Sequence, residues 1–134
     1  MSRYDKYEPK AGGFRAALAG AWASTEIGKI FGVGLDASGH VVVGAGNSGV
    51  VGVLVLTSAK AAGDIVDVMT SGEIVDATAN DGTTALTAGT AYFADPTTGV
   101  LEASATGDAF VGFTVEASRL VVRMGDLVVP APAV

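Results

Sequence analysis

The chain contains no cysteine and only one histidine, and both shortages exclude kinds of site. Without cysteine there can be no disulfide, no thiolate metal ligand and no thiol nucleophile. A chain free of disulfides suits a reducing cytosol, although it does not require one. A single imidazole cannot form a paired-histidine metal site. A Ser-His-Asp relay would have no histidine other than His40 to use. His40 follows a turn at the start of an expected strand, and we interpret it as a surface side chain.

Charged residues and long apolar runs are also scarce. Charged residues make up only 16% of the 134 residues, whereas the hydrophobic 49% is ample for one core. Val, Thr, Ala and Gly dominate over Glu, Lys and Gln, which favours a β fold with tight turns. The longest apolar stretch, residues 41–56, is too short and too interrupted to span a bilayer, and the start lacks a secretion signal. We expect one soluble domain, made in the cytoplasm, with no membrane partner.

The charge is distributed unevenly along the chain. Residues 1–29 hold five basic residues against three acidic ones, while the remainder holds three against eleven. An acidic body binds nucleic acid poorly, because affinity for a duplex depends on neutralising phosphates. The mildly basic beginning is better suited to a protein surface of complementary charge. We therefore expect a protein partner and no nucleic acid.

Residues 1–26 differ from the rest in composition. This stretch holds four of the aromatic side chains without alternation, and Pro9 and Gly12-Gly13 interrupt any regular element. The alternatives are a terminus without fixed structure and a short helix across residues 15–23, which Gly20 would weaken. Because aromatic and arginine side chains anchor interfaces, we favour an extended N-terminal arm that becomes ordered on a partner. The expected contact residues are Arg3, Tyr4, Tyr7, Phe14, Arg15 and Trp22.

The remaining residues, 27–134, are expected to form a single β domain. About nine short strands, with turn signals every 8 to 12 residues, indicate a small β-sandwich or a barrel-like domain. Four hairpins are predicted, with turns at residues 36–39, 70–72, 95–99 and 117–118. In the last strand Leu120, Val122 and Met124 alternate with Arg119, Val121 and Arg123, the period of a half-buried strand.

A glycine-rich stretch, residues 44–49, has the spacing of a dinucleotide-binding turn, G-x-G-x-x-G. That turn works only before a helix whose amide groups face a pyrophosphate. Residues 50–57 are instead rich in β-branched side chains and lack a helical apolar stripe. We therefore interpret residues 44–49 as a loop between two strands and expect no nucleotide cofactor.

No constellation of residues predicts catalysis. Asp64, Asp67, Glu73 and Asp76 lack the spacing of a cation loop, so we interpret them as solvated carboxylates at sheet edges and expect no metal site. The "GD-x-V" pattern at residues 63–66 is shared with biotinyl domains, but the hairpin tip has no lysine to carry the cofactor. We expect neither a cofactor nor enzymatic activity.

Several stretches are similar to tailed-phage head decoration proteins, also called capsid cement proteins. They are "KAAGDIVDV" followed by "SGEIVDA", then "LTAGTAYFAD", "GVLEA", "FVGFTVEA" and "RLVVRM". In that family a "G-x-x-V" strand start, a "T-A-G-T-x-x-Y" turn and a "V-G" strand recur in this order. The resemblance covers about residues 50–124, and the opening "YDKYEPKAGGFRA" resembles the leaders of actinobacteriophage versions.

This resemblance implies a small β fold of the β-tulip type, commonly a homotrimer, on the outer capsid surface of a virion. There it would reinforce the joints between subunits of the major capsid protein, and it brings no catalytic residues. A small glycan- or ligand-binding β module is the alternative. Such modules usually present exposed aromatic side chains, whereas Tyr92, Phe93, Phe110 and Phe113 fall mostly on strands and are expected in the core.

Overall fold

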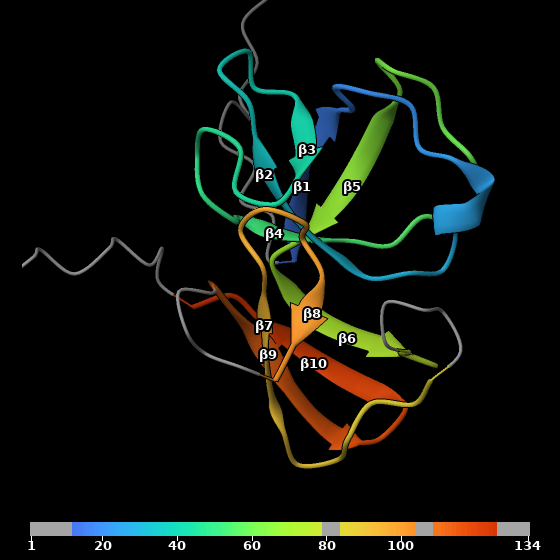
Figure 1. The fold of residues 1–134 in the computed structure, drawn as a ribbon, viewed down its shortest axis with the longest axis vertical. Coiled ribbons are helices and arrows are strands. Elements are labelled where there is room, and N and C mark those ends of the chain that lie inside the picture. Colours follow the sequence, from blue (N-terminus) through green and yellow to red (C-terminus); the bar gives the residue numbers. More distant parts are fainter. Residues whose placement is uncertain (1–11, 79–83, 104–108, 126–134) are drawn as a thin grey trace, which may run out of the picture.

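The described chain, residues 12–78, 84–103 and 109–125 of a computed structural model, is almost entirely β structure. It forms ten strands and one three-residue helical turn, η1 (Ser24–Glu26). The strands make two antiparallel sheets of five, which Figure 1 shows one above the other along the long axis. The expected all-β fold, a small β-sandwich, is confirmed. No helix in these ranges is long and apolar enough to cross a membrane.

The first sheet holds the first five strands in the order β1-β5-β4-β2-β3. They are β1 (Gly13–Ala17), β2 (Phe31–Leu35), β3 (Val41–Val43), β4 (Gly52–Leu54) and β5 (Ile65–Met69). The second sheet has the order β6-β10-β9-β7-β8. Its strands are β6 (Ser71–Val75), β7 (Ala91–Ala94), β8 (Leu101–Glu102), β9 (Ala109–Glu116) and β10 (Arg119–Arg123).

The chain crosses from one sheet to the other between β5 and β6. Only Thr70 separates these strands, and they pair with different partners: β5 with β1 and β4, and β6 with β10. The Thr70 amide donates to the Gly12 carbonyl, and the Thr70 carbonyl accepts from the Met124 amide. The hairpin expected at residues 70–72 is therefore wrong, because one residue cannot reverse the chain as a two-residue hairpin loop does. The other three predicted hairpins are confirmed.

Residues 12–26 belong to the fold, contrary to the expected boundary between an arm and a body at residue 26. β1 pairs with β5 along its whole length, from Gly13 opposite Met69 to Ala17 opposite Ile65. Leu18, which follows β1, is 1% exposed. Buried and exposed side chains do not alternate along this strand, so the sequence shows no strand period, and its partner lies some fifty residues away. Residues 1–11 of the expected arm lie outside the described ranges.

The buried side chains form two clusters, one on each face of the first sheet. Val53 packs in the cluster between the sheets, with Leu120 and Val122 of the second sheet. The next residue, Leu54, packs in the other cluster, together with Leu18. β4 is therefore buried on both faces, which explains why this stretch of sequence reads as a continuous apolar run.

A buried threonine organises the far end of the second sheet. The Thr114 hydroxyl donates to the Thr87 carbonyl and accepts from the Thr90 amide at 3.0 Å. The Thr87 amide in turn donates to the Tyr92 hydroxyl at 2.8 Å, and Gly89 takes a positive φ of 66°. The "LTAGTAY" stretch, residues 86–92, is thus a turn fastened to β9 by side-chain hydrogen bonds.

In two of the confirmed hairpins an aspartate side chain accepts hydrogen bonds from backbone amides of the turn. The Asp36 carboxylate accepts from the amides of Ser38 and His40, at 2.8 and 2.9 Å. The Asp95 carboxylate accepts from those of Thr97 and Thr98, at 2.7 and 2.9 Å. Backbone donors stabilise the ionised form, so the His40 amide lowers the pKa of Asp36 and the Thr98 amide lowers the pKa of Asp95.

We expect these two turns to make stability depend on acid pH. The folded pKa of each carboxyl lies below its ordinary 3.8, so the stabilisation is present above that value and is lost as the pH falls through the folded pKa. The double variant Asp36→Asn, Asp95→Asn keeps an acceptor oxygen in each turn but cannot ionise. Its melting temperature should fall less than that of the wild type between pH 4 and pH 2. Parallel melting curves over this range would contradict the assignment.

Candidate functional site

The glycine-rich stretch, residues 44–49, is a loop between β3 and β4, as interpreted from the sequence. Most of its amides donate within the chain: the Ala45 amide donates to the Pro96 carbonyl at 2.7 Å, and the Asn47 amide donates to the Leu35 carbonyl at 2.8 Å. Gly44 has a φ of 79°, and a Cβ there would lie 2.5 Å from the Pro96 oxygen. Position 44 therefore requires glycine, because the backbone there packs closely against the turn at residues 95–99.

The four carboxylates considered for a cation do not form a single site. Asp67 on β5 pairs with Arg15 across the first sheet, and Glu73 on β6 pairs with Arg119 across the second. Asp64 accepts a hydrogen bond from a backbone amide in its own turn. Within the described ranges, no three acidic or histidine side chains are grouped as metal ligands would be.

Of the six expected contact residues, the structure places three. Phe14 and Arg15 lie next to each other on β1, at the edge of the first sheet, with Phe14 half-buried. The Arg15 Nε donates to the Asp67 Oδ1 at 2.8 Å, and both side chains are mostly exposed, at 66% and 79%. Such a solvent-screened pair contributes at most about 1 kcal/mol, so Arg15 is available to a partner at small cost. Arg3, Tyr4 and Tyr7 lie outside the described residues.

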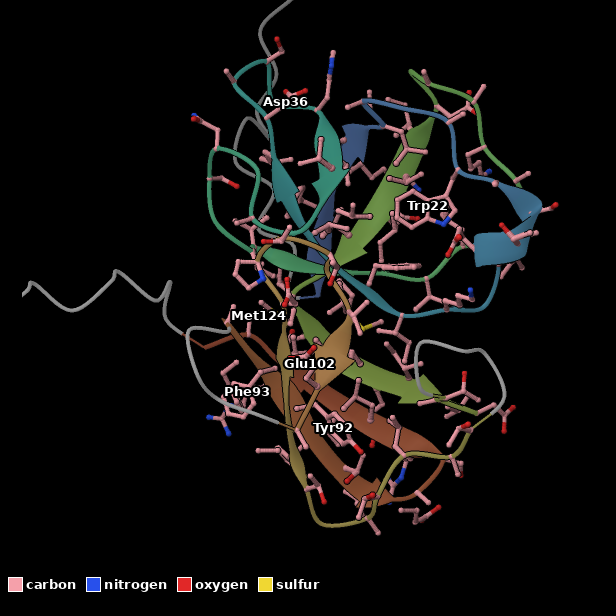
Figure 2. The ribbon with its side chains drawn as sticks, viewed as in Figure 1. Trp22, Asp36, Tyr92, Phe93, Glu102 and Met124 are labelled. Atoms are coloured by element: carbon pink, nitrogen blue, oxygen red, sulfur yellow. The ribbon has the colours of Figure 1, made fainter. Side chains whose placement is uncertain are left out.

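Trp22 is a core residue, contrary to the expectation that it lies on an arm outside the core. Its side chain is 7% exposed and stacks edge-on against Phe31 with 5.4 Å between ring centroids. Figure 2 shows the ring between β5 and η1. The backbone of Trp22 exchanges two hydrogen bonds with Lys60, which fixes the ring against the first sheet. The buried indole Nε1 has no hydrogen-bond partner among the described residues.

The aromatic side chains of the body divide between core and surface. Tyr92 is buried as expected, and Phe93 packs edge-on against Phe110 with 5.5 Å between centroids. Phe113, also expected in the core, is 38% exposed. The physical reason is the strand period: Thr114 turns inward to fasten residues 87–90, so Phe113 and Val115 on either side of it turn outward.

Phe113 is part of an apolar surface that sequence reasoning missed. It lies opposite Val121 on β10, and Val75 on β6 and Val115 on β9 are exposed nearby in the same sheet. We call Val75, Phe113, Val115 and Val121 the outer apolar face. The alternation around Thr114 is the sequence signal that could have indicated it.

Ion pairs border the outer apolar face. Arg119 on β10 donates to Glu73 on β6 at 2.9 Å and to Glu116 on β9 at 3.2 Å. One guanidinium therefore links three adjacent strands, while the apolar side chains beside it remain open to a partner. An apolar centre with a charged rim is the usual composition of a protein-binding surface.

Comparisons with known proteins identify a shared fold but no family. A chain of known structure from Mycobacterium phage Patience superimposes with a TM-score of 0.73 at 21% sequence identity, over 92% of this chain and 96% of that chain. At this identity the likeness establishes a shared fold. No protein-family profile matches the chain, and no curated protein matches it.

We expect two N-terminal truncations to differ sharply in stability. Removing residues 1–11 leaves β1 paired, so the melting temperature should stay near that of the full chain. Removing residues 1–20 takes away β1 and Leu18, and should lower it by many degrees or prevent folding. Equal melting temperatures for the two truncations would mean that β1 contributes nothing to the fold.

Trp22→Ala should lower the free energy of unfolding by about 3–5 kcal/mol, the usual effect of removing a buried aromatic side chain.

The loop at residues 44–49 should bind no dinucleotide, because most of its amides already donate to carbonyls of this chain. Differential scanning fluorimetry with millimolar NAD, FAD and ATP should leave the melting temperature unchanged. A ligand at a hundred times its Kd would add about 2.7 kcal/mol, which is readily detected. A saturable increase with any of the three would overturn the interpretation.

Proposed function

We propose that the protein is a structural component of a tailed-phage virion that decorates and reinforces the outer surface of the capsid. The observation that carries the proposal is the fold shared with a chain from Mycobacterium phage Patience over nearly the full length of both chains. The sequence resemblance to capsid cement proteins points to the same role, and its motifs fall on strands and turns of this fold.

The partner in this proposal is the major capsid protein, and the protein acts as a homotrimer. The chemistry of the surface supports a protein partner: the chain carries a net charge of −6, and Arg15 lies exposed at the edge of the first sheet. Each large apolar side chain buried at a joint contributes about 1.5–3 kcal/mol. Three copies of one contact surface on a trimer strengthen attachment through effective concentration.

The segment that anchors the protein is the beginning of the chain, with Arg3, Tyr4 and Tyr7 followed by Phe14 and Arg15. Trp22 leaves this set, because its ring is buried. We propose a structural role without catalysis or a cofactor. It is supported by the engagement of the exposed carboxylates with arginines and backbone amides.

A glycan- or ligand-binding β module remains the second candidate. The exposure of Phe113 favours it, since glycan sites usually present an aromatic ring on which a sugar face can stack. Binding on a glycan array that Phe113→Ala abolishes would support this candidate against the capsid role.

The capsid role is tested by co-sedimentation with undecorated capsids of the phage that encodes the chain. Full-length protein should saturate the capsids. Removal of residues 1–11 should weaken binding by orders of magnitude without changing the melting temperature. Adding Arg15→Ala to the truncated protein should weaken binding further. Lys60→Ala, in the connection between β4 and β5 and outside the proposed contact set, serves as the matched control and should bind as the wild type does.

Failure of the full-length protein to bind would overturn the capsid role itself. Undiminished binding after removal of residues 1–11 would overturn only the anchoring role of the segment. Light scattering at tens of micromolar should give the mass of a trimer, and a monomeric mass would count against the oligomer proposed here.

A further inference from the structure

Exposed apolar side chains concentrate on the outer side of the second sheet. Six large apolar side chains are exposed in the described chain, and three of them belong to the outer apolar face. Phe93 also lies on this side, opposite the buried Tyr92, as Figure 2 shows. Its ring packs against Phe110, and a bulge between Phe110 and Phe113 leaves both of these side chains on the outer side of β9. The apolar surface therefore extends along β9.

An occupant of this surface must pack through its side chains. β9 lies between β10 and β7, and β10 lies between β6 and β9, so the backbone groups of both strands are used by neighbouring strands. A segment laid across them gains no ladder hydrogen bonds, and each of its own amides that leaves water without a partner costs free energy. An apolar segment that contains proline suits such a surface, since proline has no amide hydrogen to leave unpaired.

The segment that continues from β10, residues 126–134, has this composition. Its sequence is "DLVVPAPAV", in which Asp126 is the one charged residue and Pro130 and Pro132 lack an amide hydrogen. The segment lies outside the described ranges. Proline-rich segments commonly bind to surfaces that carry aromatic side chains, as this side of the second sheet does.

The described chain ends beside this surface. The Gly125 amide donates to the Phe110 carbonyl at 3.2 Å, and a Cβ built on Gly125 would lie 3.2 Å from the Phe110 Cβ. The path from Gly125 back along β10 to Arg119 is about 20 Å, at the usual rise of a strand. The nine residues that follow Gly125 can reach about 30 Å when extended. They are therefore long enough to return along the whole outer apolar face.

We propose that residues 127–134 turn back after Gly125 and cover the outer apolar face of their own chain, so that another protein reaches this face only by displacing them. Apolar side chains of the segment replace water on Phe110, Phe113 and Val115. Attachment to β10 gives the segment a high effective concentration at the face, which favours the chain's own segment over that of a second copy. The inference concerns the free protein and does not depend on the capsid role.

The absence of cysteine allows the proposal to be tested with a spin label at one chosen position. In the full-length Ala133→Cys variant, a nitroxide on the introduced thiol should broaden the NMR resonances of Val75, Phe113 and Val115. The resonances of Val43, an exposed valine on β3 of the first sheet, should stay sharp. Reduction of the nitroxide should restore the broadened resonances.

Two further changes should each remove the broadening. Val115→Lys places a charge in the face at a position that is 49% exposed, where a substitution has a small effect on stability. Its matched control Val43→Lys, at a position 42% exposed in the first sheet, should keep the broadening. The triple variant Leu127→Ser, Val128→Ser, Val129→Ser changes only the segment, so it tests the contact even if Val115→Lys lowers the stability.

A mixed sample distinguishes the chain's own segment from that of a second copy. It combines spin-labelled chains without isotope and isotope-labelled chains without nitroxide, and it should show no broadening. Equal broadening in the mixed sample would overturn the proposal, because the segment would then come from a second copy. Broadening spread evenly over both sheets, or broadening that the triple variant leaves unchanged, would overturn it as well.

Discussion

The passage of the chain from β5 to β6 through the single residue Thr70 is the constraint on which the arrangement of the two sheets depends. Two strands joined so closely cannot pair with each other, so each must find partners in a different sheet. β5 takes β1 and β4, and β6 takes β10. The hydrogen bonds of Thr70 to Gly12 and Met124 hold the crossing in place, and they also tie the beginning and the end of the described chain to it.

The crossing explains two features of the surface. β5 lies inside the first sheet only because β1 covers its outer side, so the chain from Gly13 onward is needed for the fold and cannot act as a free arm. β6 has no such cover among the described strands, and it leaves an open edge with an apolar groove between the sheets.

Short polar side chains, more than ion pairs, define the hairpins. Asp36 and Asp95 bind the amides of their own turns, and Thr114 fastens the turn at residues 87–90 to β9. These bonds are local or lie beside buried strands, whereas the exposed pair of Arg15 and Asp67 is screened by solvent. The motifs that carry the resemblance to capsid cement proteins include this turn. They are therefore motifs of the fold, and function must be sought on the surface around them.

The β class, three of the four predicted hairpins and the loop at residues 44–49 could all be predicted from the amino-acid sequence. All of these depend on neighbouring residues: an aspartate that accepts from amides two to four residues later, a glycine at a positive φ, or the alternation of Leu120 and Val122. The position of β1, the burial of Trp22, the exposure of Phe113 and the groove beside β6 could not be predicted and became visible in the folded chain. Each of these depends on a partner far away in the chain, as Trp22 depends on Lys60 and Phe31, and Phe113 on the threonine beside it that reaches back to Thr87. Local patterns do not record such distant contacts, because the same short run of apolar residues can be buried or exposed according to which strand lies against it.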